Sequence, residues 1–281
     1  MITETFPAMG TSVQAWSDSE TGLRRTRAWF AEVEAAATRF SAWSELSRLN
    51  DDPTNPTVVS PLLARILGAA WMVRDLTDGL VDPAVGDDVI RWGYDRTFDD
   101  LGRAAVPTAP ASRGVWDIDA RLVRRTEGTR LDLGGVAKGW AADAAVEAGY
   151  ASVVSAGGDI RSAHPDTEVR ILGPDEDVVA VVGLGRRALA TSSTARRTWE
   201  TTDGRAHHLI DPRTGDPARS PVVSASAVTA TAALAEGAAK AILIHGVDGL
   251  AWADAQPWID GAVVVWEDGS VYATAELEVV A

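Results

Sequence analysis

The alternation of apolar and polar residues at the start of the chain predicts a strand followed by a long helix. Residues 11–16, TSVQAW, alternate at the two-residue period of a strand with one buried face. In residues 21–40 the period changes, and Phe30, Val33 and Ala37 recur three or four residues apart on one helical face. We therefore expect a first strand and an amphipathic first helix.

Helical spacing returns in residues 60–79, and this segment carries its own start and stop signals. Ser60 is a typical N-cap, because its hydroxyl can accept a backbone N–H of the first helical turn. Pro61 follows at the first helical position, where no N–H donor is needed. Gly79 ends the predicted helix.

The rest of the chain mixes strands with two further helices. Residues 115–120 and 121–126 predict a hairpin, and residues 136–149 and 230–246 predict helices. Other strands are predicted in residues 129–133, 150–156, 168–174, 178–185 and 187–193, with a closing hairpin in residues 261–277 that turns at Asp268-Gly269.

This mixture predicts the fold class. The helices and antiparallel strands follow no regular strand–helix–strand rhythm, which favours an α+β fold over a doubly wound parallel sheet. We expect one domain over residues 1–281. Any division into two lobes should fall at the polar, proline-rich connector of residues 103–114.

The composition narrows the classes of function. A net charge of −14 argues against binding to a nucleic-acid backbone, which needs clustered Lys and Arg. The absence of cysteine excludes disulfides, thiolate metal sites and a cysteine nucleophile. No apolar run of about 18 residues would span a membrane, and residues 1–15 lack the pattern of a secretory signal. We therefore expect a cytoplasmic protein.

Lysine is rare: the 26 basic residues include only two lysines, Lys138 and Lys240. Arginine can serve at ordinary surface positions, so both lysines are candidates for places that need a compact ammonium. Lys138 lies in LDLGGVAKG, where Gly134 and Gly135 precede a predicted helix. Glycine lets backbone N–H groups approach a ligand, and a helix N-terminus favours anions. The motif therefore predicts a phosphate contact, although a tight turn with a solvated lysine explains it equally well.

A second glycine pair occurs in SAGGDI. Gly157 and Gly158 follow a predicted strand, and Asp159 comes directly after them. The Asp159 carboxylate can accept a hydrogen bond from a ribose hydroxyl or an adenine amine. A carboxylate at such a turn also commonly caps the backbone, and both interpretations stay open.

Hydroxyl groups and arginine follow in LATSSTARR. Thr191 and Ser192 end a predicted strand, and Arg197 lies just beyond. Hydroxyls with an arginine suit a phosphate or a flavin carbonyl. A hydroxyl-rich turn is the simpler explanation when this segment is taken alone.

The segment HHLIDPRTGDP combines a histidine with a strongly specified turn. Asp211-Pro212 and Thr214-Gly215 are typical β-turn residues, and such a turn fixes the end of the strand that precedes it. It therefore also fixes His208, which can then act as a general base or orient a phosphate. A structural histidine is the alternative.

Together these segments resemble the ApbE-type FAD:protein FMN transferases. Three further segments carry the resemblance: MGTSVQAW with Gly10 and Thr11, RFSAWSELSRLN ending in Asn50, and VDPAVGDDVIRWGYD with Asp82. Each motif is weak by itself, but seven motifs in the family's order are specific. The resemblance implies an ApbE-like (T-fold-like) fold of mixed antiparallel sheets with packed helices.

The resemblance also implies an activity. Family members bind FAD, use a divalent cation, usually Mg²⁺, and cleave the FAD pyrophosphate. They attach FMN to a Ser or Thr hydroxyl of an acceptor flavoprotein and release AMP, and some hydrolyse FAD to FMN and AMP instead. A catalytically weakened FAD-binding protein, or an enzyme acting on another nucleotide-like ligand, are the alternatives for this chain.

The resemblance also implies which residues of this chain form the site, motif by motif. Lys138 would place charge on the pyrophosphate, and His208 would be the base or orienting group. The residues expected to bind FAD are Gly10, Thr11, Asn50, Asp82, Gly134, Gly135, Gly157, Gly158, Asp159, Thr191, Ser192, Arg197, Asp211 and Thr214. Because several of these motifs match the AMP half of FAD, we expect FAD to bind in preference to FMN.

Two places depart from the family pattern. After ATS the family has glycine and then tyrosine, where this chain has Ser193 and Ala195. In the last long helix the family's metal ligands are Asp and, four residues later, Thr. Here those positions hold Glu236 and Lys240, while Gly135 would supply a backbone carbonyl. Glu236 can still bind Mg²⁺, but an ammonium cannot. We therefore hypothesise that Lys240 partly replaces the cation and also acts in catalysis.

Overall fold

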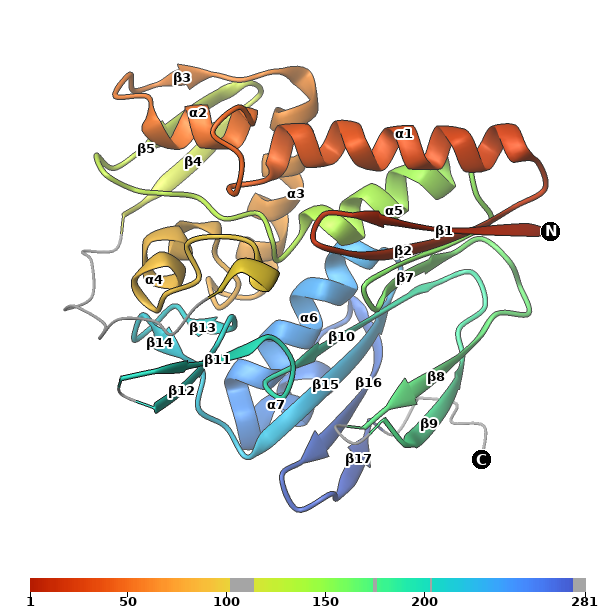
Figure 1. Ribbon diagram of the computed structural model, residues 1–281. Coiled ribbons are helices and arrows are strands. Elements are labelled where there is room, and N and C mark those ends of the chain that lie inside the picture. Colours follow the sequence, from red (N-terminus) through yellow and green to blue (C-terminus); the bar gives the residue numbers. More distant parts are fainter. Residues whose placement is uncertain (102–113, 174–175, 203, 275–281) are drawn as a thin grey trace. The chain divides into compact units, whose positions relative to one another are not determined.

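The computed structural model of the 281-residue chain describes residues 1–101, 114–173, 176–202 and 204–274 (Figure 1). It divides into two compact units. Unit 1 contains residues 1–30, 138–195 and 219–281, and unit 2 contains residues 31–137 and 196–218. The predicted lobe boundary at 103–114 lies outside the described residues except for Gly114, so it stays a prediction.

Unit 1 is built on an eight-stranded sheet in the order β1-β2-β6-β7-β10-β15-β16-β17, with every neighbouring pair antiparallel. Its strands are β1 Ile2–Ala8, β2 Thr11–Ser17, β6 Val153–Ala156, β7 Asp159–Ser162, β10 Ala188–Ser193, β15 Val222–Thr229, β16 Ile259–Trp266 and β17 Val271–Ala273. A separate two-stranded ribbon consists of β8 Glu168–Leu172 and β9 Val178–Gly183.

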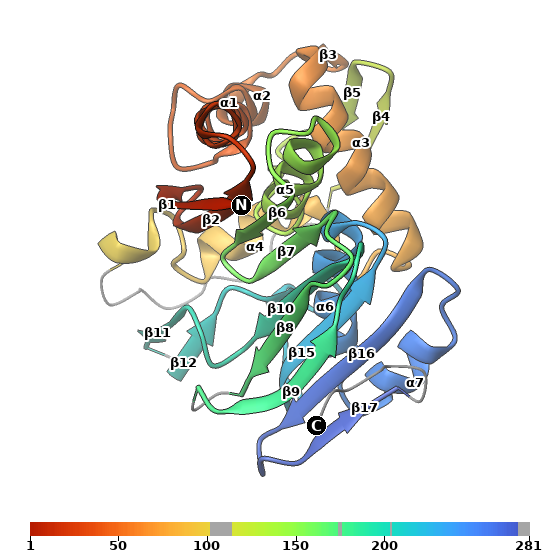
Figure 2. The ribbon, with the colours of Figure 1, turned by 90° about the vertical axis from the view of Figure 1, so that its right-hand side faces the viewer.

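The two faces of this sheet are covered differently. Helix α6, Ala232–His245, packs across β10 and β15, and the β8–β9 ribbon lies over the opposite face (Figure 2). On the ribbon side, Val182 and Leu184 meet Leu189 and Val228 in a buried apolar cluster. The alanines of α6 let it lie close to the sheet, and this closeness positions the charged residues of α6.

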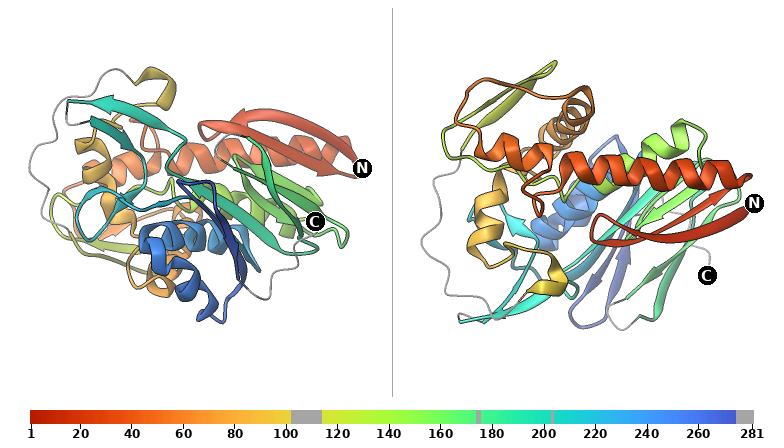
Figure 3. Two further views of the ribbon diagram at one scale, coloured as in Figure 1. Left: turned by 90° about the horizontal axis from the view of Figure 1, so that it is seen from below. Right: turned by 45° about the horizontal axis from the view of Figure 1, so that its top comes forward.

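Unit 1 also contains α5 Ala137–Glu147, η3 Gly246–Asp248, α7 Gly249–Asp254 and the first part of α1, Glu20–Ala37. Helix α1 runs alongside the β1–β2 hairpin (Figure 3), where the Phe6 and Phe30 rings pack edge to face with centroids 6.0 Å apart. Helix α1 also contacts α5, because the Trp29 indole N–H donates to the Ala141 carbonyl at 3.1 Å. Both α1 and α5 are therefore anchored in unit 1 through their aromatic and apolar faces.

Unit 2 contains short elements around helix α3, Pro61–Leu76. Ser60 caps α3 as predicted, since its hydroxyl accepts the Leu63 N–H at 3.1 Å. A three-stranded sheet has the order β3-β5-β4. The other elements, with the strands of that sheet, are α2 Glu45–Asp51, β3 Thr57–Val58, η1 Pro83–Val85, α4 Gly86–Arg91, η2 Phe98–Asp100, β4 Trp116–Asp119, β5 Leu122–Arg125, β11 Thr198–Thr201, β12 Gly204–His207, β13 Ile210–Asp211 and β14 Asp216–Pro217.

The predicted mixture of helices and antiparallel sheets is confirmed, and one predicted strand is wrong. Residues 129–133 form no strand. The Leu131 N–H and carbonyl, which a strand would pair with a neighbouring backbone, bond instead to the side-chain amide of Asn50 at 2.8 and 2.9 Å. The apolar pattern correctly predicts that Leu131 and Leu133 are buried. A strand also needs backbone hydrogen bonds to a neighbouring strand, which burial alone does not supply.

Among the residues that the structure describes, no helix has the length and apolar character to cross a bilayer.

Candidate functional site

Four charged side chains of unit 1 form a buried network around one carboxylate. The Glu236 Oε1 atom lies 2.6 Å from Lys138 Nζ and 3.0 Å from Lys240 Nζ. The Lys138 Nζ atom also lies 3.2 Å from Asp159 Oδ2. The second Glu236 oxygen, Oε2, accepts the Gly139 N–H at 3.3 Å. We call Lys138, Asp159, Glu236 and Lys240 the lysine–carboxylate network.

Burial and the two lysines set the electrostatics of this network. Burial alone would raise the pKa of Glu236, but the Lys138 and Lys240 ammonium groups overcome it and lower that pKa to about 2. Burial and the neighbouring Glu236 charge raise the pKa of Asp159 to about 6, against the opposing effect of the lysines. Glu236 therefore stays ionised at and well below neutral pH, whereas Asp159 takes up a proton as the pH falls through about 6.

The local structure of helices α5 and α6 explains why these residues meet. Glu236 and Lys240 are four residues apart in α6 and so share one helical face. Gly139 lets α5 approach closely, because an added Cβ would lie 2.5 Å from the Ala232 carbonyl oxygen. The two helices are also joined by Asp143, whose carboxylate accepts the N–H groups of Ala232 and Ala233 at 2.7 and 3.0 Å.

The sequence did not reveal the role of Asp143. Its carboxylate caps the N-terminus of α6, and Arg161 Nε of β7 lies 3.4 Å away. Burial raises the pKa of Asp143 to about 6, although the two backbone N–H bonds and Arg161 favour the charged form. Asp143 stands five residues after Lys138, but a cap supplied by a different helix leaves no local pattern to recognise.

The glycine pair of SAGGDI is a two-residue hairpin turn. Gly157 and Gly158 have φ values of +64° and +101°, and they join β6 to β7 with Ala156 paired to Asp159. An added Cβ on Gly157 would lie 2.4 Å from Thr11 Oγ1, so the start of β2 packs directly on this turn. Gly10, with φ +66°, forms part of the β1–β2 turn just before Thr11.

The predicted hydroxyl pair is divided between the two faces of the sheet. Thr191 Oγ1 lies 2.8 Å from Ser226 Oγ on the adjacent strand β15, and Thr191 shares its face with Leu189. Ser192, its neighbour in β10, points to the opposite face and is buried. A single ligand on one face of this sheet can therefore contact only one of the two side chains.

In unit 2, the segment around His208 is held on both sides. The His207 ring bonds to the Ala218 carbonyl through Nε2 at 3.0 Å and to the Leu209 N–H through Nδ1 at 3.3 Å. Burial lowers the pKa of His207, so this ring is neutral and structural. The Leu209 carbonyl accepts the Ala218 N–H at 2.9 Å. His208 itself is half-buried, and its backbone is fixed by these neighbours.

The turn that follows His208 forms as predicted. The Gly215 N–H donates to the Asp211 carbonyl at 2.8 Å, and Gly215 has φ +76°. The Asp211 carboxylate pairs with Arg213, with Nη2 and Oδ2 2.8 Å apart, and Thr214 accepts the Asp216 N–H at 3.2 Å. The side chains of Asp211 and Thr214 therefore stabilise the turn, and their FAD contacts stay predictions.

Other predicted site residues of unit 2 have structural partners. The Asp82 carboxylate accepts from the Ala84 N–H, the Trp116 indole and Arg74 Nε, each at 2.9 Å. Asp132 Oδ1 accepts the Gly134 N–H at 2.6 Å in the turn before α5. Arg197 adopts a φ of +50°, which marks a turn after β10.

The predicted site residues therefore fall into two sets. Unit 1 carries the lysine–carboxylate network with Gly10, Thr11, Gly157, Gly158, Thr191 and Ser192. Unit 2 carries Asn50, Asp82, Gly134, Gly135, Arg197, His208, Asp211 and Thr214. The structure brings the four charged residues of unit 1 into contact, and it separates Thr191 from Ser192 by the sheet.

The network residues do not fit a divalent cation. Glu236 Oε1 already accepts from two ammonium groups, and Oε2 accepts a backbone N–H. Lys240 brings a positive charge where the family resemblance implies a neutral hydroxyl ligand. No group of three or more His, Asp or Glu residues among those described could hold a metal ion. The proposed carbonyl ligand of Gly135, in the turn before α5, stays a prediction.

Comparison with known proteins supplies the family. The model of the ApbE family matches residues 9–262. This chain belongs to the ApbE family. The ApbE-like fold expected from the motifs is confirmed: the ApbE protein of Thermotoga maritima superposes with a TM-score of 0.84 at 24% identity, covering 98% of this chain and 97% of that chain.

Members of the ApbE family with assigned activity share moderate identity with this chain. An FAD:protein FMN transferase of Rhodobacter capsulatus is 33% identical, over 78% of this chain and 45% of that protein. This chain therefore spans about half the length of that relative. An FAD:protein FMN transferase of Vibrio cholerae is 28% identical over 94% of this chain and 87% of that protein. The structure of the flavin transferase ApbE from Vibrio cholerae gives a TM-score of 0.81 at 25% identity, covering 98% of this chain and 97% of that chain. The chain is thus a member of the FAD:protein FMN transferase family.

Proposed function

We propose that this chain binds FAD, cleaves its pyrophosphate and transfers FMN to a Ser or Thr hydroxyl of an acceptor flavoprotein. The observation that carries the proposal is the lysine–carboxylate network, which fixes Lys138 of the AKG motif beside the SAGGD turn in a chain of this family. Attack on a pyrophosphate needs fixed positive charge at the non-bridging oxygens, and a buried, paired ammonium supplies it without reorganisation.

In the proposed reaction one bond to phosphorus forms and another breaks. The acceptor oxygen forms a bond to the phosphorus of the FMN half, and the bond from that phosphorus to the bridging oxygen breaks. AMP leaves with the bridging oxygen, and the proton of the acceptor hydroxyl passes to His208. The constraints on His207 and Leu209 support this role, because they fix the backbone at His208.

The first experiment follows the products. FAD is incubated with the chain and with an array of Ser- and Thr-containing peptides, while AMP is measured by chromatography and covalent flavin by fluorescence on the peptides. Transfer predicts AMP together with flavin bound to a peptide. AMP with an equal amount of free FMN would replace transfer by FAD pyrophosphatase activity, and FAD binding without AMP would leave a binding protein only.

Substitution of the proposed base is the second experiment. We expect His208→Ala to lower the rate of AMP release by about 10²-fold or more while FAD affinity changes little. His164→Ala is the matched control, because His164 lies in the loop after β7 and is also half-buried. A His208→Ala protein that is folded and retains the parental rate would assign His208 a structural role.

A further inference from the structure

Within the lysine–carboxylate network, the two lysine side chains are less deeply buried than the two carboxylates. The Glu236 and Asp159 side chains are only 2% and 4% exposed, while those of Lys138 and Lys240 are 12% and 15% exposed. A ligand that reaches the network is therefore expected to contact the lysine side chains before the carboxylates. This arrangement favours an anion and disfavours a metal ion, which would need to reach the carboxylate oxygens.

The two lysines are also held in place before any ligand arrives. Both ammonium groups bond to the same Glu236 oxygen, and Gly139 of α5 donates to the other one. A lysine side chain normally loses considerable rotamer freedom when it binds a ligand, and here that loss has already occurred on folding. Lys240 makes one hydrogen bond to Glu236, so a three-donor ammonium keeps capacity for a second acceptor.

We infer that Lys138 and Lys240 form a two-ammonium clamp for the pyrophosphate of the dinucleotide, and that the clamp takes this pyrophosphate free of magnesium. The inference rests on the proposed function for the identity of the dinucleotide. It extends the hypothesis for Lys240 to Lys138. Both ammonium groups pair with the same Glu236 oxygen, so we expect both to contact the same pyrophosphate.

The clamp reverses the usual effect of magnesium. A Mg²⁺ ion on a pyrophosphate occupies its non-bridging oxygens and cancels part of its charge. The ammonium groups would bind those same oxygens and that same negative charge, so Mg²⁺ competes with them. Free FAD is therefore the preferred ligand, and added Mg²⁺ weakens binding in this chain, whereas a metal-dependent site would show the opposite response.

Calorimetry with FAD and with ADP, first in EDTA and then in millimolar Mg²⁺, tests the inference. The parent should bind both ligands in EDTA and bind them more weakly in Mg²⁺. Lys240→Met should weaken binding in EDTA by about tenfold or more, the loss of one charge-assisted hydrogen bond. Arg24→Met is the matched control, because Arg24 forms an exposed helical pair with Glu20 four residues away, and we expect no change.

A double variant tests the assignment of the clamp to the family's metal position. Glu236→Asp with Lys240→Thr restores the ligand types that the family resemblance implies. We expect this variant to need Mg²⁺ for FAD binding, so that the sign of the magnesium effect is opposite to the parent's. A parent that binds FAD only with Mg²⁺ would overturn the clamp and leave the proposed function standing.

Lysine-selective NMR gives a readout that is independent of turnover. The chain has two lysines, so ¹⁵N-lysine labelling yields two side-chain Nζ signals. Inorganic pyrophosphate in EDTA should shift both signals, and FAD should do the same. If FAD binds and neither signal moves, the clamp is wrong. If pyrophosphate shifts both signals and FAD does not bind, the clamp stands and the proposed flavin transferase function is wrong.

Discussion

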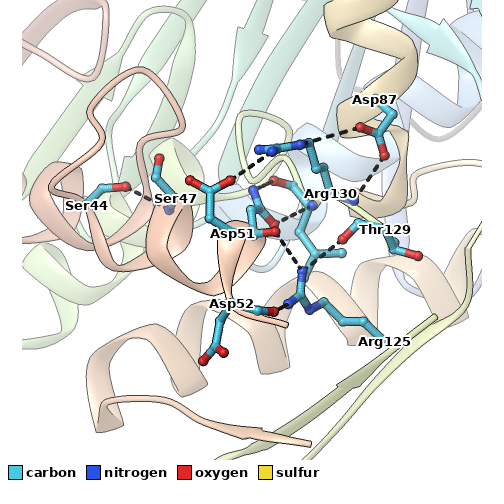
Figure 4. Close-up of polar contacts among 10 residues, drawn as sticks. Ser44, Ser47, Asp51, Asp52, Asp87, Arg125, Thr129 and Arg130 are labelled. Carbon is cyan, nitrogen blue, oxygen red and sulfur yellow. Dashed lines mark hydrogen bonds and ion pairs between the residues drawn. The ribbon is translucent and has the colours of Figure 1, made fainter. Parts of the chain in front are cut away.

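Buried lysines of unit 1 and surface arginines of unit 2 show two different uses of positive charge. In unit 1, Lys138 and Lys240 share the fully buried Glu236. In unit 2, Arg125 and Arg130 lie beside α2 among polar groups that include Asp51 (Figure 4). The two regions are both clusters of basic and acidic groups. The contacts of the basic side chains distinguish the cluster with a structural role from the cluster with a binding role.

Arg125 contacts backbone carbonyls, and Arg130 contacts surface carboxylates. Arg125 donates to the carbonyls of Asp52 and Thr129 at 2.9 Å each, and so satisfies the carbonyl end of α2. Arg130 forms an ion pair with Asp51 at 2.8 Å in which both side chains are about half exposed, at 42% and 63%. A planar guanidinium can bridge several oxygens in this way. These arginines are used to complete the fold.

The lysine contacts described above are with carboxylate side chains. They involve Glu236 and, for Lys138, also Asp159. Burying these charges is costly, so the ion pairs add little to stability by themselves. The partner of a basic residue therefore matters more than its type: charge directed at the backbone stabilises the fold, while charge held on a buried anion beside a turn is available for a ligand.

The largest effect is expected from a substitution in the buried lysine–carboxylate network of unit 1. Glu236→Gln removes the anion between two ammonium groups, and we expect it to lower the free energy of unfolding by about 3 kcal/mol. Asp51→Asn removes the anion of the exposed Arg130 pair and should cost less than about 1 kcal/mol. Urea denaturation of both variants measures the difference. Equal losses would mean that burial does not separate the two clusters.

An intermediate loss of stability is expected when Arg125 can no longer bridge backbone carbonyls. Arg125→Lys keeps the charge but cannot bridge the carbonyls of Asp52 and Thr129 together, so we expect a loss of about 1–2 kcal/mol with FAD binding unchanged. Arg124→Lys is the control, because Arg124 pairs only with the exposed Asp117 at 2.9 Å in the bonds described. A change in FAD affinity for Arg125→Lys would contradict the assignment of this cluster to stability.

The smallest expected effect is a pH dependence from His207 in unit 2. Burial lowers the pKa of His207 below its ordinary value of 6.5, so the unfolded chain binds more protons in this pH range than the folded protein. Its contribution to stability is complete above pH 6.5 and is lost as the pH falls below it, by at most about 1.4 kcal/mol per pH unit. Melting temperatures of the parent and of His207→Asn across this range measure it, and parallel curves would exclude His207 as the source.

Sequence pattern predicted much of the fold because its signals are local. The cap at Ser60, the turn at Gly215 and the end of the helix predicted over residues 230–246 all appear as expected, since each depends on a few neighbouring residues. The strand predicted at 129–133 failed for a non-local reason. A side-chain amide from α2, Asn50, takes the backbone bonds that the pattern assigned to a ladder.

The sequence by itself determined that Glu236 and Lys240 meet, because residues four apart on a helix share a face. Only the tertiary structure decided that Lys138, 98 residues away, reaches the same carboxylate oxygen and that Asp159 lies beside it. It also decided that the two carboxylates are buried more deeply than the two lysine side chains. The physical reason is that helical periodicity fixes neighbours on one element, whereas the partner of a buried charge is set by the packing of α5 against α6 and β7.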